Sequence, residues 1–557
     1  MPYLVPYDFP FHTMNPKLLL ARFTVNSKVH CFQDFRLVSC EPIFDLTQVP
    51  YPPSVRKIGH SLLFKGFSFL RYENLELVEL DGTRRCASSL YQSMSSSLPK
   101  DEREVYVRAI LRSLRHAGVK FLRFQSLDAG NAVRVKAVPL EFIERSCGLD
   151  SQVAMAEVVF GGLPSFGDYI QEASGLDATK VLRLIPDIGT LRVLPYATRS
   201  AIVLCTLRDT ITNDHSELCC RSLLRKIVQE AKDEHKIAFS VGSELEFSLF
   251  DFKTKQPVDE TNFAHSGTLN QQDNFIEKLY DALIAQEIDV EQIHAESGPG
   301  QVEVVLQYCR NPVEMADRIV MTRETITSVA RSCNMLALFL PKIYTNKAGN
   351  GNHLHISICD ATTGENLFPA KHVSTPMTTP AEPTVKHLSP MARSFIEGIL
   401  CHLPALLAVT LPTTNSFRRV GPGCWTGSSI KWAFNDKESP IRLAASLETG
   451  TWNRFEYKLM DCTANPYLAM ATILSAGLEG ITTQAALRPV AKTTDSNADR
   501  LPLTLSECLD VLEDDEFIKS KISPKLLRAY LACRRAEVEH AKERPLEAEV
   551  TEAIRLA

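Results

Sequence analysis

The chain has 557 residues, of which 45% are hydrophobic and 23% are charged, and its formal net charge is −5. This composition is ordinary for a soluble globular protein, and the length predicts two or three domains rather than one small core. The slightly acidic balance, with a pI near 6.3, argues against a protein that binds nucleic acid or an anionic membrane surface. No stretch reaches the length of an apolar membrane span, so we expect no membrane partner.

The N-terminal and cysteine patterns predict a cytoplasmic protein. The start of the chain, MPYLVPYDFPFHTMNP, lacks the basic end and the continuous apolar stretch of a secretory signal. The 15 cysteines are scattered and include no Cys-x-x-Cys pair. A zinc site and a disulfide framework are therefore both disfavoured, and we expect reduced thiols.

Residues 1–118 carry few sharp structural signals, and we treat them as an N-terminal extension of unassigned fold. Within this region, residues 64–80 are predicted to form one or two strands, and residues 92–98 (QSMSSSL) a mobile loop. Residues 101–116 are predicted to be helical because their apolar side chains recur on one side. Gly118 provides a plausible stop for this helix.

Short strand-like runs then predict a small, half-open sheet domain over residues 119–208. The runs are separated by turn sequences such as Asp128-Ala129-Gly130-Asn131. They lie at residues 119–127, 133–138, 191–195 and 201–206.

From residue 209 to residue 557, helix-length and strand-length segments alternate, which predicts an α+β domain. We expect helices at residues 216–235, 274–285, 312–332, 391–408, 466–485 and 521–542, and strands at residues 237–252, 301–307 and 335–340. Residues 361–390 are rich in Thr and Pro and are predicted to be a surface insertion.

Four glutamates lie on predicted strands or beside them. Glu244 and Glu246 are two residues apart in GSELEF, so on a strand they share one face, where carboxylates repel each other unless cations neutralise them. Glu303 lies on QVEVVL, and the turn Gly298-Pro299-Gly300 can bring Glu296 back towards that strand. For each motif taken alone, a solvated strand face or an acidic loop is the plain alternative.

Two histidines follow the same spacing in NHLHISI. On a strand, His353 and His355 share one face. A His-x-His pair is more often hydrogen-bonded structure than a metal site, and that alternative stays open here. The preceding Ala348-Gly349-Asn350-Gly351 permits close approach of the backbone to a phosphate.

Cationic side chains complete the set of polar motifs. Arg454, Glu456 and Lys458 share one face of NRFEYKL, which an exposed strand with charge pairs would also explain. Arg418-Arg419 and Arg442 can receive a carboxylate or a phosphate with two hydrogen bonds. Considered together, the acids and imidazoles suit Mg²⁺ or Mn²⁺, and their combination with cations suggests an ATP-dependent enzyme.

In this order, the segments resemble the type I glutamine synthetase family over about residues 119–557. The similarity rests on PDIGTLR at 186–192, GSELEF, the Glu296/Glu303 loop, NHLHIS, NSFRR at 415–419 and NRFEYKLMDCTANPYLAMATILSAGLEGI. The segments GCWTG at 423–427 and ESPIR at 438–442 look closer to the fungal and plant branch of FluG-type proteins and γ-glutamyl–amine ligases.

The resemblance implies an α+β fold in which a small β-grasp domain, residues 119–208, precedes a catalytic domain, residues 209–557. The catalytic domain would have a curved antiparallel sheet with flanking helices, and would bind ATP at one end of a funnel and glutamate at the other. The resemblance also implies two or three Mg²⁺ or Mn²⁺ ions. The metal ligands that it implies are Glu246, Glu296 and Glu303 for one ion and Glu244, His353 and Glu456 for a second.

The other site residues are also carried over from the resemblance. Arg419 matches the position that binds the substrate α-carboxylate, and Gly349 matches a glycine that lines the glutamate site. Arg442 matches a residue that stabilises the transferring phosphoryl group, and with Lys437 and Glu303 it forms the implied catalytic set. The implied nucleotide-side residues are Arg454, His355 and Ser357.

Five positions depart from the family pattern, and two of them, Asp436 and Ala348, stand where the family commonly has asparagines. Trp425 stands where glutamine synthetases have a flap glutamate that binds and deprotonates ammonium, and an indole cannot accept a proton. Its ring could pack on an alkyl or aromatic amine, attract an ammonium group, or simply be a packed loop aromatic. Lys437 replaces the family's second phosphate-stabilising arginine, and Lys458 replaces its second arginine that binds the substrate carboxylate. Both changes keep the charge but lose the bidentate fork. The ammonium-site aspartate of the first domain has no firm match, and Asp168 is the candidate.

The leading hypothesis is a γ-glutamyl–amine ligase that joins glutamate, or an analogue, to an amine other than ammonia. The alternatives are a catalytically weak structural or signalling assembly, favoured by the two lysines and Trp425, and an authentic glutamine synthetase that uses ammonia. The family also implies a homo-oligomer, a dodecamer of two hexameric rings.

Overall fold

The computed structural model describes residues 68–72, 75–80, 83–86, 100–145, 153–371, 384–421, 423–446, 449–490 and 499–557, with side chains from residue 107 onwards. Phe67–Ala557 form one compact unit. The loop predicted at residues 92–98 and the centre of the insertion predicted at residues 361–390 lie outside the described residues.

A three-stranded antiparallel sheet comes first in the described part of the chain. It has the order β1 (Ser68–Tyr72), β2 (Leu75–Leu80), β3 (Thr83–Cys86), and α4 (Lys100–His116) follows it. The predicted strands within residues 64–80 and the predicted helix at residues 101–116 are confirmed where the structure describes them.

The second sheet forms over the residues where the small sheet domain is predicted. Its order is β5-β4-β9-β7-β6, with β8 paired to β9, and only the β4–β9 pair is parallel. The strands are β4 (Phe121–Leu127), β5 (Val133–Pro139), β6 (Ala154–Ala156), β7 (Val181–Pro186), β8 (Arg192–Val193) and β9 (Ser200–Asp209). The short helices here are α5 (Leu140–Arg145), η1 (Glu157–Phe160), η2 (Glu172–Ser174) and η3 (Ile188–Thr190). The exact domain boundaries stay predictions.

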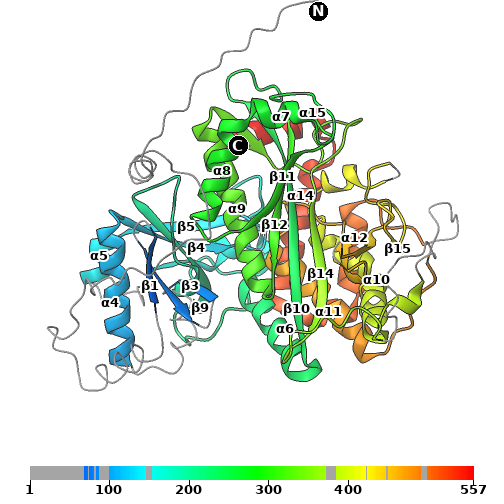
Figure 1. The fold of residues 1–557 in the computed structure, drawn as a ribbon, viewed down its shortest axis with the longest axis horizontal. Coiled ribbons are helices and arrows are strands. Elements are labelled where there is room, and N and C mark those ends of the chain that lie inside the picture. The colour runs from blue at the N-terminus through cyan, green and yellow to red at the C-terminus, as the bar shows by residue number, and fades with distance from the viewer. Residues whose placement is uncertain are drawn as a thin grey trace, which may run out of the picture. The chain divides into compact units, whose positions relative to one another are not determined.

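The third sheet is the largest and has the order β11-β12-β10-β14-β17-β16-β15, with β13 also paired to β10. All its pairs are antiparallel except β15–β16. Figure 1 shows the long strands β10, β12 and β14 side by side. The strands are β10 (Ile237–Asp251), β11 (Val290–Ala295), β12 (Gln301–Cys309), β13 (Met335–Leu338), β14 (Asn352–Asp360), β15 (Trp432–Phe434), β16 (Ile441–Ala445) and β17 (Trp452–Tyr457).

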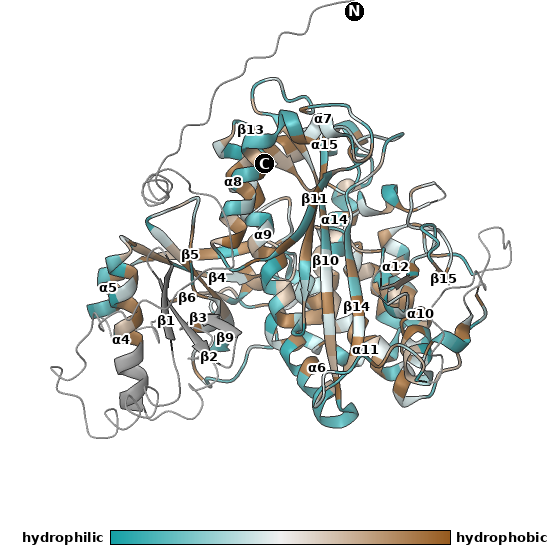
Figure 2. Cartoon of the chain, in the orientation of Figure 1, coloured by the Kyte–Doolittle hydropathy of each residue, from teal (hydrophilic) through white to brown (hydrophobic). Residues whose placement is uncertain are grey.

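Apolar and polar residues alternate in the middle of β10, and Figure 2 shows the hydropathy changing along this strand. Leu245, Phe247 and Leu249 are fully buried, and α6 (Cys220–His235) and α9 (Pro312–Ser332) contact this strand. Burying one face of an antiparallel sheet against helices leaves the residues between them, including the glutamates of GSELEF, on the opposite face.

The remaining helices lie between and after these strands in the chain. They are α7 (Ser266–Gln271), α8 (Asp273–Ile284), η4 (Val385–His387), α10 (Pro390–Thr410), η5 (Ser416–Arg419), α11 (Pro466–Thr482), α12 (Leu505–Asp514), α13 (Glu516–Lys521), α14 (Pro524–Ala541) and α15 (Leu546–Leu556). All six helices predicted after residue 209 are present to within a few residues, whereas the shorter α7, α12, α13 and α15 were missed.

Helix α10 is long and apolar enough to cross a membrane by length and composition alone. However, 72% of its most apolar window is buried inside the protein, where it packs against α11 and α12. A helix apolar on all sides and covered by other helices is what the interior of a large domain requires. We therefore assign α10 to the core.

Candidate active site

The pairing register of the third sheet brings acidic side chains to one face. Glu246 on β10 lies directly opposite Glu303 on β12, and Glu303 lies opposite His294 on β11. Glu244 lies opposite His353 on β14. Because directly opposed residues in an antiparallel pair project to the same side, these side chains form a row across the sheet.

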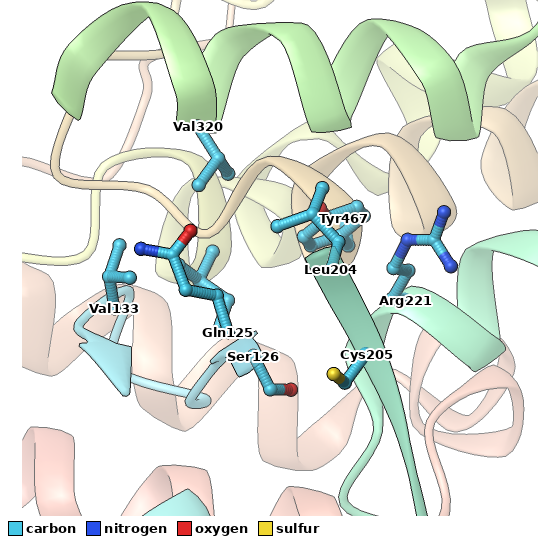
Figure 3. A pocket seen from close by; sticks show the side chains of 9 residues that line it. Gln125, Ser126, Val133, Leu204, Cys205, Arg221, Val320 and Tyr467 are labelled. Atoms are coloured by element: carbon cyan, nitrogen blue, oxygen red, sulfur yellow. The ribbon is translucent and has the colours of Figure 1, made fainter. Parts of the chain in front are cut away.

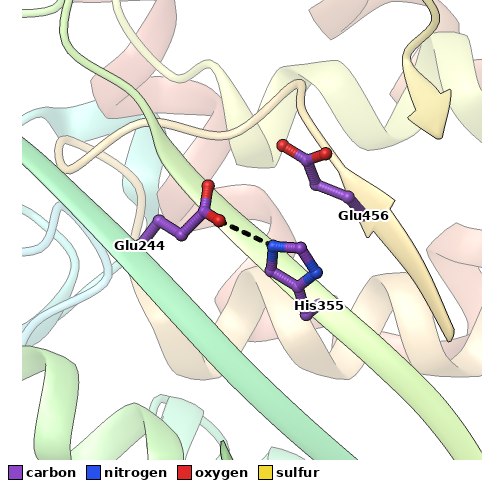
Figure 4. Close-up of side chains that lie close together, drawn as sticks. All are labelled: Glu244, His355 and Glu456. Carbon is purple, nitrogen blue, oxygen red and sulfur yellow. Dashed lines mark hydrogen bonds and ion pairs between the residues drawn. The ribbon is translucent and has the colours of Figure 1, made fainter. Parts of the chain in front are cut away.

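A neighbouring row, two residues further along β14, runs across the next two strands. His355 on β14 lies opposite Glu456 on β17, and Glu456 lies opposite Arg442 on β16. Figure 4 shows Glu244, His355 and Glu456 extending from three neighbouring strands. Five strands thus supply the carboxylates and imidazoles of one site.

The first cluster is centred on Glu244. The Nδ1 atom of His353 lies 3.1 Å from Glu244 Oε2 and 3.3 Å from Glu456 Oε1. Oxygen atoms of Glu244 and Glu456 and a ring nitrogen of His355 lie within 4.8 Å of one another, close enough to share a metal ion. The predicted ligands of the second ion are therefore brought together, with His355 beside them.

His355 positions Glu244 in this structure. Arg454 Nε lies 3.3 Å from His355 Nδ1, and since a guanidinium only donates hydrogen bonds, Nδ1 accepts. Nε2 of His355 then carries the ring proton and donates it to Glu244 Oε1 at 2.8 Å. The nucleotide-side roles implied for Arg454 and His355 stay predictions.

The second cluster contains His294, Glu296 and Glu303, whose ligand atoms also lie within 4.8 Å of one another. His294 Nε2 is 3.3 Å from Glu296 Oε1 and 3.7 Å from Glu303 Oε1. Glu246 is held next to this group because its Oε2 accepts hydrogen bonds from Gly351 N (2.7 Å) and Gln301 Nε2 (3.1 Å). The sequence analysis missed His294, although its two-residue spacing from Glu296 was a usable signal.

The carboxylates of the two clusters differ sharply in electrostatic state. Burial, and after it the charges of four neighbouring glutamates, raise the pKa of Glu303 to about 10. Burial would also raise the pKa of Glu244, but hydrogen bonds from His353 and His355 hold it well below its usual range. Burial is likewise outweighed at Glu456, whose pKa falls to about 2 because of the charge of Lys458 and the two histidines.

Five carboxylates converging on one partly buried face repel one another unless cations offset the charge. The five are Glu244, Glu246, Glu296, Glu303 and Glu456. Oxygen-rich sites with at most one or two imidazoles are typical of Mg²⁺ and Mn²⁺. The residues present therefore fit divalent cations, and the raised pKa of Glu303 indicates that the site is under-compensated by the protein alone.

Cations line the side of the site near Glu456. Arg442 Nε pairs with one oxygen of Glu456, and Lys458 Nζ lies 2.9 Å from the other. Arg419, only 3% exposed, has Nη2 at 3.3 Å from His353 Nε2. Three of the predicted substrate and phosphate contacts are thus within reach of the first cluster.

Close backbone approach explains the glycines of this region. A Cβ on Gly349 would overlap the carbonyl oxygen of Pro341, and one on Gly351 would lie 2.6 Å from His353 Nε2. The carbonyl oxygen of Gly349 also accepts a hydrogen bond from Gln301 (3.0 Å). The predicted glutamate-site glycine is therefore packed between Arg419 and the second cluster.

Two further predicted residues lie less centrally. Ser357 Oγ donates to the carbonyl oxygen of Asn453 (2.7 Å) and accepts from Asn366 (2.8 Å). Asp168 is exposed in the loop between η1 and η2. The positions of Ser357 and Asp168 do not test the nucleotide-side role and the ammonium-site role implied for them.

Trp425 lies on a loop that is held by the segment before β16. Its φ is 58°, an uncommon value for a large residue, and its N–H donates to Glu438 Oε1 at 3.1 Å. Its ring meets Phe263 edge-on at 6.5 Å between centroids, and the amine of Lys437 lies 4.8 Å from the Trp425 centroid. Phe263 was missed because an aromatic residue in a loop gives no sequence signal of its own.

A separate small cavity lies between the second sheet and the helices α6, α9 and α11 (Figure 3). Gln125, Cys205 and Arg221 are among the residues that line it. It lacks the carboxylate cluster of the candidate site, so we assign it a structural role.

Comparisons with known proteins agree with this geometry. Residues 217–553 match the family described as "Glutamine synthetase, catalytic domain", which is more than half of the chain. Among curated proteins, the chain is 30% identical over 454 residues to the γ-glutamylpolyamine synthetase GlnA3 of Streptomyces coelicolor, covering 77% of this chain and 92% of that protein. It is 28% identical over 473 residues to the protein fluG of Emericella nidulans, covering 81% of this chain and 49% of that protein.

Among solved structures, the crystal structure of a novel glutamine synthase homolog superposes with a TM-score of 0.68. The two sequences are 28% identical, and the match covers 79% of this chain and 99% of that chain. The predicted fold class, a glutamine synthetase-like α+β fold, is confirmed. The chain therefore belongs to the glutamine synthetase family of ATP-dependent carbon–nitrogen ligases.

Proposed function

We propose that this protein is a γ-glutamyl–amine ligase, which activates the γ-carboxylate of glutamate or a close analogue with ATP and joins it to an amine other than ammonia. The observation that carries the proposal is the pairing of a full set of acidic clusters with Trp425 at the expected acceptor side. The acidic clusters favour retained ATP chemistry, and an indole cannot receive a proton from ammonium.

The proposed reaction has two steps. An oxygen of the γ-carboxylate attacks the γ-phosphorus of ATP while the bond to the β-phosphate oxygen breaks, giving an acyl phosphate and ADP. The amine nitrogen then attacks the acyl carbon, phosphate leaves with the shared oxygen, and the amine loses one proton. Water must be excluded between the steps because it would hydrolyse the acyl phosphate.

The protein's own residues would orient the reactants. Arg419 is buried beside His353 and would bind the α-carboxylate of the substrate. Beside Arg419, the close packing at Gly349 leaves no room for a side chain at that position. Arg442 would face the phosphate end, and Lys458 would contact a carboxylate of the substrate. The amines of Lys458 and Lys437 would attract an anion as point charges and would not form the two parallel hydrogen bonds of an arginine.

Divalent cations would be held at the two acidic clusters. Glu246, Glu296 and Glu303 would hold one ion. Glu244, His353 and Glu456 would hold a second. When bound, such ions neutralise the phosphate charge and align the reacting oxygens.

From the family alone, we also propose that the protein is cytoplasmic and forms a dodecamer. A native mass twelve times that of the 62.2 kDa chain would support the dodecamer.

An acceptor screen tests the proposal. Purified protein receives ATP, Mg²⁺ or Mn²⁺, glutamate and one amine at a time, with phosphate release and product mass as readouts. Turnover with organic amines above that with ammonia is the expected result. Ammonia as the best acceptor would indicate an authentic glutamine synthetase, and ATP binding without turnover would favour the structural or signalling alternative.

Glu246→Ala tests the metal assignment. We expect it to remove turnover and leave the native mass unchanged, because the hydrogen bonds of the Glu246 side chain lie within the candidate site. Glu277→Ala on the exposed side of α8 is the matched control and should retain turnover. Full turnover in Glu246→Ala would remove this residue from the proposed metal ligands.

A further inference from the structure

Lys437 stands over two aromatic rings rather than beside an acid. Its amine lies 4.8 Å from the ring centroid of Trp425 and 5.8 Å from that of Phe263. Within the described part of the chain, Lys437 forms no ion pair. Its charge therefore faces the space above the two rings without a neutralising carboxylate.

These rings connect the surface to the second acidic cluster. Phe263 meets the imidazole of His294 edge-on at 5.5 Å, and His294 Nε2 is 3.3 Å from Glu296. Trp425 and Phe263 are 45% and 48% exposed. The aromatic surface thus begins at the proposed glutamate-side metal ligands and ends in solvent.

The position of Trp425 is fixed from two sides. Its N–H donates to Glu438, and a Cβ on Gly427 would overlap the carbonyl oxygen of the same Glu438. Lys437 is the residue immediately before Glu438, so the rings and the charge are placed by one tight contact between two loops. A binding surface held in this way loses little freedom when a ligand arrives.

The charge selects the kind of ligand. A cation attracted to the face of Trp425 would meet the like charge of Lys437, which already lies over that ring. An alkyl or aromatic stem can pack on the rings with no such cost. A carboxylate or phosphate at the far end of the stem would find in Lys437 its complementary charge.

We infer that the acceptor is an amine with an apolar stem that packs on Trp425 and Phe263 and with an anionic group at its far end that pairs with Lys437. This inference rests on the proposed function and names the class of its second substrate. It excludes diamines and longer polyamines as preferred acceptors.

Three acceptors of equal length test the charge preference. They are 5-aminopentanoate, pentylamine and 1,5-diaminopentane, which differ only in the far group. We expect kcat/KM for 5-aminopentanoate to exceed that for 1,5-diaminopentane at least about tenfold in the wild type, from one charge–charge contact at the protein surface. Lys437→Gln should bring the ratio close to equality, and Lys437→Glu should reverse it.

Lys255→Gln is the matched control. Lys255 also lies over an exposed aromatic ring, 4.2 Å from the centroid of Phe252, in a hairpin after β10. Its variant should keep the wild-type ratio. A wild-type ratio at or below one, or an unchanged ratio in Lys437→Gln, would overturn the inference.

Hydroxylamine separates this inference from the proposed function. This small nucleophile has no stem, so glutamyl hydroxamate reports the acyl phosphate alone. Hydroxamate with no charge preference among the three amines would overturn the inference and leave the ligase proposal standing. Absence of hydroxamate and of all other turnover would overturn the ligase proposal.

If the protein shows no turnover, a binding measurement still tests whether Trp425 and Lys437 bind an anionic amine. The chain has three tryptophans, and Trp432 and Trp452 are buried while Trp425 is exposed. Titration with 5-aminopentanoate should change the tryptophan fluorescence more than titration with 1,5-diaminopentane, and Trp425→Phe should abolish the change. Equal responses, or none, would overturn the inference.

Discussion

Glu303 carries an unusual electrostatic load for a single side chain. It is buried, it lies opposite both Glu246 and His294 in the sheet, and its pKa is raised to about 10. A carboxylate in this environment destabilises the cation-free protein and becomes useful when a cation arrives.

Replacing Glu303 should therefore have opposite effects with and without metal. In EDTA at neutral pH, Glu303→Gln should raise Tm by about 2–4 °C, because glutamine is neutral and avoids the free-energy cost of protonating this buried carboxyl on folding. In the wild type, millimolar Mg²⁺ or Mn²⁺ should raise Tm by binding the folded state, and this rise should shrink or vanish in the variant. Differential scanning fluorimetry at one pH measures all four values.

The control is Glu277→Gln, which removes an exposed carboxylate on α8. It should change neither the Tm in EDTA nor the metal-dependent rise. A full metal-dependent rise in Glu303→Gln would contradict the assignment of Glu303 as a ligand.

At the scale of elements, α10 and α11 approach each other closely. A Cβ on Gly480 would overlap the carbonyl oxygen of Ser394 and lie 2.7 Å from the Cα of Gly398. The glycines let two long, buried helices approach with their backbones, which larger residues would prevent.

Gly480→Ala should lower the free energy of unfolding by about 1–3 kcal/mol, as overpacking of a filled core does. Although alanine has the higher helix propensity, the gain of about 1 kcal/mol does not offset a backbone overlap. Urea unfolding measures the change. Thr482→Ala, on the exposed end of the same helix, should stay close to wild type, and equal stability of both variants would refute the close-packing argument.

Helix α13 depends on a charged cap. Asp515 Oδ1 accepts from Ile518 N at 2.9 Å and Oδ2 lies 2.7 Å from His402 Nδ1 on α10. Burial alone would raise the pKa of Asp515, but the hydrogen bonds from His402 and from the helix N-terminus lower it.

A lowered folded-state pKa fixes the sign of the pH dependence. The stabilisation by Asp515 is fully present above the unfolded-state pKa of an aspartate, and it is lost as the pH falls through the lower folded-state pKa. Asp515→Asn should thus be less stable than wild type by about 1 kcal/mol at pH 7, with the deficit narrowing only below about pH 4. Urea unfolding between pH 7 and pH 3.5 tests this, with exposed Asp514→Asn as control; a deficit that grows towards low pH would contradict it.

At the scale of the whole molecule, one buried ion network joins the second sheet to the helices behind the third. Arg221 on α6 donates two hydrogen bonds to Asp317 on α9, at 2.8 and 2.7 Å, and also lies 2.8 Å from Asp187, just before η3. Tyr467 at the start of α11 donates to the same Asp317 (2.6 Å). Arg221 and Asp317 together thus link the segment before η3 with α6, α9 and α11.

Arg221→Met should cost about 3–5 kcal/mol, because it leaves Asp317 buried and uncompensated. The control is Arg225→Met on the same helix, which also loses a contact with Asp187 but is half-exposed, so its cost should be below about 1 kcal/mol. Chemical unfolding gives both values. Similar stability of the two variants would show that the buried network does not hold these elements together.

Simple periodicities predicted the strands and the long helices, whereas the fold class and the site assignments came from the resemblance to the glutamine synthetase family. The alternation of acids and apolar residues around Glu244 and Glu246 predicted a strand with one polar face, and β10 has that form. The long helices were predicted for the same reason. Helices as short as α13, with six residues, offer too few turns for a periodic signal.

What the sequence could not predict depends on contacts between distant segments. Phe263 reaches His294 and Trp425 across three separate parts of the chain, and nothing local marks it. The position of Lys437 over the rings likewise follows from the loop contact with Glu438. Such placements are set by tertiary packing and not by spacing along the chain.

The cross-strand register of the third sheet has a consequence for how the protein can be handled. A slip of one residue between β10 and β12 would send Glu246 and Glu303 to opposite faces, and a slip of two would leave them diagonal. Molecules paired out of register would keep their secondary structure but lose the cation site. Titrating a preparation with Mn²⁺ should therefore count the correctly paired molecules in it, which circular dichroism cannot do.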